Sequence, residues 1–285
     1  MKLNRTLVMC LTIALAATIA IGGSMAYLTS TDGQRNVMTV GNVEIVQNEY
    51  QRDENGELTD FQDGENKMLP AYYHGEATVI PGYDGSVHVN GKDYPIWDEA
   101  VDGVVDKIVT VENTGSEELF VRTIVAFEHT DPNNDGDFSD GIAWKVHFLG
   151  NYGEDKPWDA EFYTGTMLDN LLVGGKYWSL VTFTHKDAVP AGTEENPSIT
   201  EPSLMQVFFE KDVDGDDLAA VNGEYEIIVL SQAVQSQMGG LTAEQALDEA
   251  FCDMSDANAA QIAQWLKGQI PAAAFEGDGA TYGEE

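Results

Sequence analysis

The stretch KIVTVENTGSEELFVRTIVAFE, residues 107–128, decides the fold class. Residues 108–111 and 119–127 are runs of β-branched, aliphatic and aromatic residues, which favour strands. Residues 113–117 between them are rich in turn-forming types, so the pattern predicts strand, turn and strand. Apolar residues occupy both faces of the second run apart from Arg122. We therefore expect a strand that is buried on both faces, with Arg122 paired to a carboxylate in a structural role.

Further strands are predicted on both sides of this unit. Residues 142–149 alternate, with Ile142, Trp144, Val146 and Phe148 on one face. Residues 177–184, 204–209 and 225–232 are also predicted strands, and residues 86–93 predict a hairpin whose Asn90-Gly91 pair suits a type I′ turn. Residues 47–64 are polar and acidic, and we expect an exposed loop there. Many short strands with little helix indicate an all-β, antiparallel β-sandwich.

The C-terminal part changes character from strand to helix. Thr242-Ala-Glu-Gln245 matches a capping box, and an apolar face follows at Ala243, Ala246, Leu247, Ala250, Phe251 and Met254. A second helix is predicted over residues 256–267, ended by Gly268 and Pro271. We expect these two short helices to cover one end of the sandwich. Cys252, between Phe251 and Met254, is predicted to be a small core residue and not a reactive thiol.

The N-terminus matches a secretory signal peptide. Lys2 and Arg5 precede an uncharged, apolar run over residues 6–23, and Ser24-Met25-Ala26 places small residues before a predicted cleavage between Ala26 and Tyr27. An uncleaved membrane anchor is the alternative, since the run is near the short limit for a bilayer span. The predicted organisation is a signal peptide at 1–26, a β-sandwich domain with long insertions at 27–240, and a helical appendage with an acidic tail at 241–285.

Charge restricts the partners. The chain has 14 Lys and Arg against 49 Asp and Glu, which gives a net charge of −35. Removal of residues 1–26 takes away two basic residues and no acidic one, so the net charge of the exported chain is −37. Such a charge disfavours nucleic acid and anionic membrane surfaces, because contact with phosphate needs Lys and Arg. Only Cys252 remains after cleavage, so an intrachain disulfide is excluded.

Residues 36–46, NVMTVGNVEIV, predict a strand with apolar residues on both faces. Together with residues 26–32, 107–115, 120–122 and 225–237, this segment resembles the TasA/camelysin family of exported bacterial biofilm-matrix proteins. The resemblance implies a jelly-roll-like β-sandwich, export by a Gram-positive-type bacterium, signal removal by a dedicated signal peptidase and, for TasA-like members, assembly into extracellular fibres. It also implies that residues 107–128 form a central hairpin. Residues 64–106 and 186–201 are longer than the family pattern.

Exposed sheet edges accept a strand from another chain. We therefore expect a secreted structural protein that polymerises with itself or with related matrix proteins. The predicted donor strand contains Val37, Thr39, Val40, Gly41, Val43 and Ile45. A monomeric secreted adhesin or binding module, whose first strand stays in its own sheet, is the alternative. In that case residues 36–46 are simply a core strand.

A camelysin-like metallopeptidase is a third possibility. The chain has no His-Glu-x-x-His motif, and its five histidines, His74, His88, His129, His147 and His185, are scattered singly. A catalytic zinc ion needs three convergent protein ligands. We therefore expect no enzymatic activity.

Two acidic segments are candidate Ca²⁺ sites. The first has oxygen-bearing side chains at Asp131, Asn133, Asp135, Asp137 and Asp140, with Gly136 at the sixth position. This matches the start of an EF-hand loop, but Ile142 stands where the bidentate Glu would be. The second is looser, with Asp212, Asp214 and Asp216. The alternative for both segments is turn chemistry without metal, since Asn, Asp and Gly favour turns.

Overall fold

The computed structural model describes residues 30–32, 43–62, 66, 68, 70–72, 85–96, 103–133, 135–150, 162–221, 224–237 and 239–269. The predicted signal peptide, the Ala26–Tyr27 cleavage site, four predicted donor-strand residues (Val37, Thr39, Val40 and Gly41) and the acidic tail lie outside these ranges. No helix in the described ranges is long and apolar enough to cross a membrane.

Two sheets form the body of the molecule. The first, called the β8 sheet, runs β1 (Ser30–Asp32), β15 (Ile227–Gln235), β8 (Leu119–His129), β12 (Lys176–His185) and β10 (Tyr163–Thr164), with β11 (Met167–Val173) also paired to β12. Every pair in it is antiparallel. Residues of β8 are buried on both faces along most of the strand, as its sequence predicts.

The second sheet, called the β7 sheet, runs β3 (Leu58–Asp60), β2 (Ile45–Arg52), β7 (Val105–Asn113), β14 (Leu204–Glu210) and β4 (Pro70–Tyr72). Strand β13 (Ser198–Ile199) also pairs with β7, and β9 (Val146–Gly150) pairs with β14. The short β14–β4 pair is parallel and the others are antiparallel.

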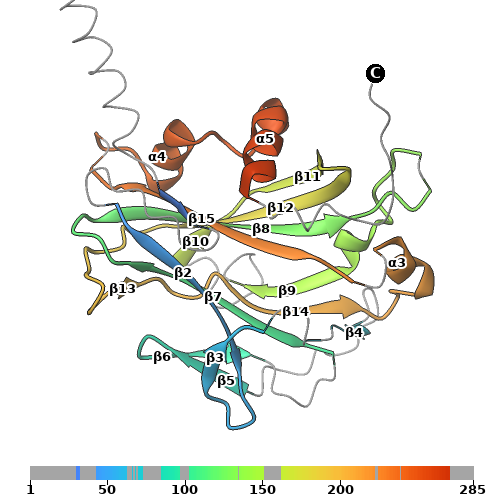
Figure 1. The fold of residues 1–285 in the computed structure, drawn as a ribbon, viewed down its shortest axis with the longest axis horizontal. Coiled ribbons are helices and arrows are strands. Elements are labelled where there is room, and N and C mark those ends of the chain that lie inside the picture. The colour runs from blue at the N-terminus through green and yellow to red at the C-terminus, as the bar shows by residue number, and fades with distance from the viewer. Residues whose placement is uncertain are drawn as a thin grey trace, which may run out of the picture.

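The inner faces of the two sheets share one core. Val109 and Val207 from the β7 sheet pack with Val125, Val181 and Val229 from the β8 sheet. The connections β7–β8, β8–β9, β9–β10, β12–β13 and β14–β15 each pass from one sheet to the other. The predicted jelly-roll-like β-sandwich is therefore confirmed, with the two sheets stacked face to face (Figure 1).

The implied hairpin over residues 107–128 is wrong. Strands β7 and β8 form as predicted, but each lies in a different sheet, and the turn between them connects the two sheets. The buried Asn113 holds this connection. Its amide nitrogen donates to Glu117 O at 2.8 Å and to Pro190 O at 2.7 Å, and its Oδ1 accepts from Gly115 N at 3.0 Å.

The outer face of each sheet is covered by a further layer (Figure 1). The hairpin β5 (Gly85–Val89) and β6 (Lys92–Ile96) packs its apolar side chains against Ile108 and Met205 of the β7 sheet. Positive φ angles of 48° at Asn90 and 78° at Gly91 confirm the predicted type I′ turn.

Helices α4 (Ala243–Ala250) and α5 (Ala259–Gln269) lie over the outer face of the β8 sheet, not over one end of the sandwich as expected. The predicted capping box of α4 is present, because Thr242 accepts from Gln245 N and the Gln245 side chain accepts from Thr242 N. Ile262 and Leu266 of α5 are buried against β8, β11 and β12. Cys252 follows α4 and is half-buried, and burial raises its pKa, as suits an unreactive thiol.

Two other predictions of local structure need correction. The expected loop at 47–64 contains β3 and most of β2. The expected strand over 142–149 begins as a 3₁₀ turn, η1 (Ile142–Lys145), and becomes strand β9 only at Val146. Thr130 Oγ1 accepts a hydrogen bond from Ile142 N at 3.1 Å, which fixes the start of this turn.

Candidate functional site

The first candidate site is the edge of the β8 sheet at β15. Hydrogen bonds from Glu128 N to Glu226 O and from Ser236 N to Glu118 O show that the even-numbered residues of β15 direct their backbone groups towards β8. The odd-numbered residues therefore direct theirs to the sheet edge. Strand β1 pairs with residues 231–233 at this edge, only three of the nine residues of β15. Over residues 227–230, no strand of the described ranges lies on this side.

A side chain from the other sheet reaches the same edge. Gln47 of β2 donates from Nε2 to Val229 O at 3.1 Å and accepts from Ser231 Oγ at 2.7 Å. The Gln47 amide therefore hydrogen-bonds to one of the carbonyl groups that point to the sheet edge, and it links the two sheets. Within the described ranges, three residues of β1 and one side chain of β2 therefore hold this edge.

The described part of the predicted donor strand belongs to the chain's own core. Val43 is 2% exposed and Ile45 is 4% exposed, and both pack with Val111, Leu119 and Ala233. Ile45 is the first residue of β2 and pairs with Asn113 of β7. Residues 43 and 45 therefore act as core residues within this subunit.

The five predicted ligands of the first acidic loop lie between β8 and η1. Their side chains largely accept hydrogen bonds from the loop itself: Asp131 accepts from Gly136 N at 2.9 Å, Asp135 from Asp137 N at 2.9 Å, and Asp137 from Ser139 N at 3.0 Å. Asn133 donates to Asp140 at 3.0 Å. These contacts are those of consecutive Asx turns.

The second acidic segment forms a helix start. Asp214 is the N-cap of α3 (Gly215–Ala220) and accepts from Asp216 N and Asp217 N, while Asp217 accepts from Asp214 N. Asp217 also binds Lys145, with both oxygens 2.9 Å from Nζ. The D-x-D-G pattern here serves as a capping box. Across the described ranges, no three His, Cys, Asp or Glu side chains are grouped as a metal site.

The described histidines occupy separate places. His88 lies on the outer hairpin beside Asp93, with Nδ1 and Oδ1 2.7 Å apart. At the end of β12, His185 contacts Glu201 at 2.8 Å. Burial of Glu201 opposes its ionisation, but hydrogen bonds from His185 and Lys92 outweigh that effect and lower its pKa to about 2. His129 is buried at the end of β8, and burial lowers its pKa to about 4.

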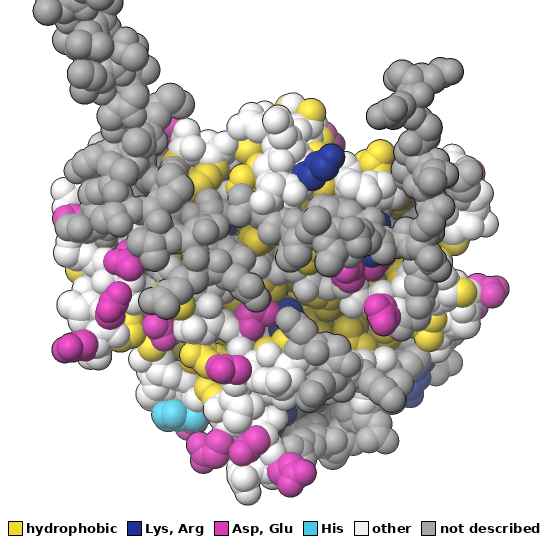
Figure 2. Space-filling view, in the orientation of Figure 1, with side chains coloured by type: hydrophobic (Ala, Val, Ile, Leu, Met, Phe, Trp, Pro, Cys, Tyr) yellow, Lys and Arg dark blue, Asp and Glu magenta, His cyan; other side chains and the backbone are white. Residues whose placement is uncertain are grey.

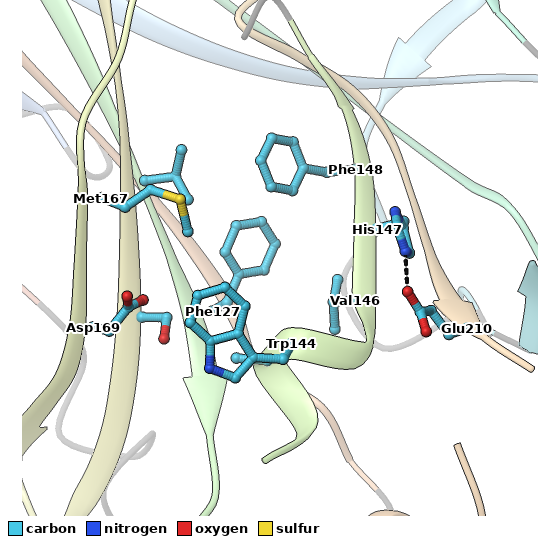
Figure 3. A pocket seen from close by; sticks show the side chains of 11 residues that line it. Phe127, Trp144, Val146, His147, Phe148, Met167, Asp169 and Glu210 are labelled. Carbon is cyan, nitrogen blue, oxygen red and sulfur yellow. Dashed lines mark hydrogen bonds and ion pairs between the residues drawn. The ribbon is translucent and has the colours of Figure 1, made fainter. Parts of the chain in front are cut away.

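A pocket of about 250 Å³ lies between β9 of the β7 sheet and β11 of the β8 sheet (Figure 3). Phe127, Val146 and Phe148 form apolar walls, and the rings of Phe127 and Phe148 stack at 5.3 Å. Trp144 and Met167 flank them and are 47% and 42% exposed. Apolar walls with a few polar groups are typical of small-ligand sites. The pocket could not be predicted from the sequence patterns, because β11, which supplies Met167 and Asp169, was not among the predicted strands.

Four polar side chains border the pocket. His147 and Glu210 bind each other at one side, and the His147 ring stacks on Phe208 at 5.4 Å. On the other side are Asp169 and Ser179, where Asp169 Oδ1 and Ser179 Oγ are buried and have no hydrogen-bond partner in the described structure.

Asp169 lines the pocket from the same face of β11 as Met167, two residues earlier. Leu168 pairs with Leu180 and Leu171 with Trp178, so β11 contains a bulge between Leu168 and Leu171. Asn170 within it has a φ of 60°. The extra residue of a bulge shifts the alternation of the side chains that follow it. Here Leu168 and Leu171 stay in the core under α5, while Asp169 lines the pocket.

On the face seen in Figure 2, acidic side chains are scattered among the described residues, and Lys and Arg side chains are sparse. Comparisons of the chain with protein-family models, with curated proteins and with solved structures return no match.

Proposed function

We propose that this chain is a secreted, non-enzymatic structural subunit of an extracellular matrix, which polymerises by exchange of its N-terminal strand. The observation that carries the proposal is the edge of β15. On the side of β15 away from β8, the only strand partner in the described ranges is the N-terminal β1. Strand β1 pairs with three of the nine residues of β15. This edge is therefore held by the segment that cleavage after Ala26 would free.

The charge and the topology support the same mechanism. An edge strand with unpaired backbone groups accepts a further strand through main-chain hydrogen bonds. If one subunit donates its N-terminal segment to β15 of the next, the contact is head to tail and does not close, so a filament grows. A charge of −37 on the exported chain opposes disordered aggregation and favours a specific contact.

The first experiment removes the donor. Deletion of residues 27–42 leaves Val43 and Ile45 in place, which matters because both are buried in the core. The expected result is a folded monomer that forms no filaments, as seen by electron microscopy and size-exclusion chromatography. Filaments that persist after the deletion would contradict strand exchange.

The second experiment blocks the acceptor. Ile227 is odd-numbered and directs its N–H to the edge, whereas Ile228 directs its N–H to β8. Proline removes that N–H group, and it is tolerated on a strand only where the group is not in a ladder. We expect Ile227→Pro to stay folded and lose filaments. Ile228→Pro, its matched control, should lower the melting temperature because it breaks the β8–β15 ladder.

A monomeric secreted binding module is the second candidate. The burial of Val43 and Ile45 in their own sheet favours it, since a first strand that stays in its own domain needs no partner. In that case the full-length mature protein remains a monomer at high concentration.

A further inference from the structure

We propose that the pocket between β9 and β11 binds a small organic amine with a flat apolar body. This ligand site is separate from the β15 edge and does not depend on strand exchange. Its polar side is Asp169 and Ser179, and its apolar side is Phe127, Val146 and Phe148. Figure 3 shows Asp169 and Met167 across the cavity from Val146 and Phe148.

The size and shape of the cavity suit one ring with a short arm. Its volume is about 250 Å³. A cavity of roughly 150 Å³ is enough to hold benzene. Phe148 stacks on Phe127 and meets Phe183 edge-on at 6.0 Å, so these walls are packed and fixed. Trp144, 47% exposed at the rim, can cover the outer face of a bound ring.

The polar side of the pocket can accept hydrogen bonds from a donor group on the ligand. Ser179 is only 5% exposed, and its Oγ has no hydrogen-bond partner among the described residues. The same holds for Asp169 Oδ1. Leaving buried polar groups unpaired costs free energy, and such groups in a folded protein call for a partner. Asp169 and Ser179 lie on adjacent strands next to the bulge, so one ligand group can reach both.

The negative charge of Asp169 and of the whole chain favours a ligand with an amine over one with a neutral or acidic group. An ammonium group has three donors and no acceptor, and its hydrogen bonds to a carboxylate are strengthened by charge. The neighbouring cations are already engaged: Lys145 binds Asp217 at 2.9 Å, and Lys176 binds Glu226 at 2.6 Å. The net charge of −35 also attracts cations and repels carboxylates.

The test uses the purified mature chain and 2-phenylethylamine as the probe. Its counterpart, 3-phenylpropionate, has the same ring and a similar arm but a negative charge. Binding is measured by isothermal titration calorimetry and by the fluorescence change expected from Trp144 at the rim. We expect saturable binding of the amine with one site per chain and none of the carboxylate. No saturable amine binding, or equal binding of both probes, would overturn the proposal.

Substitutions inside and outside the pocket test where the amine binds. Asp169→Asn is expected to weaken amine binding at least about tenfold, since it removes the charge-assisted bond. Asp187→Asn, an exposed position outside the pocket, removes the same charge and should leave binding unchanged. Ser179→Ala is expected to weaken binding by a smaller factor, and circular dichroism checks that each variant is folded. Equal weakening by Asp169→Asn and Asp187→Asn would mean that the amine binds the acidic surface and would refute the pocket.

Discussion

His129 should make the protein less stable as the pH falls below neutrality. The ring is 3% exposed at the end of β8, with Phe138 at 5.4 Å and Trp144 at 6.5 Å between ring centres. Nδ1 accepts a hydrogen bond from Thr130 N at 3.0 Å, which places the proton of the neutral ring on Nε2. Nε2 has no partner in the described structure. The site therefore holds a neutral imidazole and offers nothing to an imidazolium.

The magnitude follows from the pKa difference. Burial lowers the pKa of His129 from 6.5 to about 4. Between these values the unfolded chain binds a proton that the folded chain does not, so stability is lost as the pH falls from 6.5 towards 4. One pKa unit corresponds to about 1.4 kcal/mol, which gives a loss of roughly 2 kcal/mol at pH 5 and about 3 kcal/mol below pH 4.

The assay compares the pH dependence of two proteins. In His129→Asn, the amide oxygen can still accept from Thr130 N but no group titrates. The smaller side chain lowers stability at every pH, so the informative quantity is the change in the free energy of unfolding between pH 7 and pH 5, from urea titrations. We expect this change to be about 2 kcal/mol larger in the unmodified protein. His88→Asn, at a ring that is 66% exposed, should behave as the unmodified protein. Equal pH dependence in the unmodified protein and His129→Asn would refute the reasoning.

Two further predictions concern a buried charge and the first acidic loop. Arg122 is 2% exposed beneath α4 and binds Asp248 at 2.8 Å and Gln232 at 2.6 Å. Asp248→Asn should lower the free energy of unfolding by about 1–3 kcal/mol in urea titrations, because a buried cation loses its counter-charge, while Glu249→Gln, at an exposed position of α4, should change it little. If the loop at 131–140 holds Ca²⁺, millimolar Ca²⁺ should raise the melting temperature relative to EDTA, and Asp135→Asn should abolish the rise; an unchanged melting temperature would leave the loop as turns alone.

The strands with continuous apolar sequence were predictable. β8, β12 and β14 lie inside their sheets, and β15 is mostly buried although it lies near an edge, so burial on both faces leaves a clear apolar pattern in each sequence. The type I′ turn at Asn90-Gly91 and the capping box at Thr242 were also predictable, because backbone angles and local hydrogen bonds decide them within a few residues. Arg122 pairs with Asp248, as its position among apolar residues predicted.

Strand β2 was not predictable by the same means, because its polar residues find partners far along the chain. Gln47 binds β15, Glu49 binds Lys107, and Arg52 binds Asp106 at 2.5 Å. In the sequence these residues have the composition of an exposed loop. Only the fold supplies the charges and amides that make them suitable for a sheet.

For a related reason, the sequence could not predict that the chain passes from one sheet to the other between β7 and β8. A turn of this length can close a hairpin or connect two sheets, and the local residues fit both. Pairing with distant strands decides between them, since β7 lies between β2 and β14 and β8 lies between β12 and β15. Likewise, Asp214 in a D-x-D-G pattern fits either a calcium loop or a helix N-cap. In the structure Asp214 is an N-cap, and the neighbouring Asp217 forms an ion pair with the distant Lys145.

The described part of the predicted strand over residues 36–46 begins at Val43. From Val43 onward its residues contribute to the core with Val111 and Leu119, and exchange of that part would expose apolar surface in the donating subunit. In the described ranges β1 pairs with β15 at three residues, so the proposed exchange at this edge would break little of the donor's described structure. Under the strand exchange proposed above, the donated segment would therefore end before Val43. A subunit that donates it keeps its own sandwich, as a polymer of folded subunits requires.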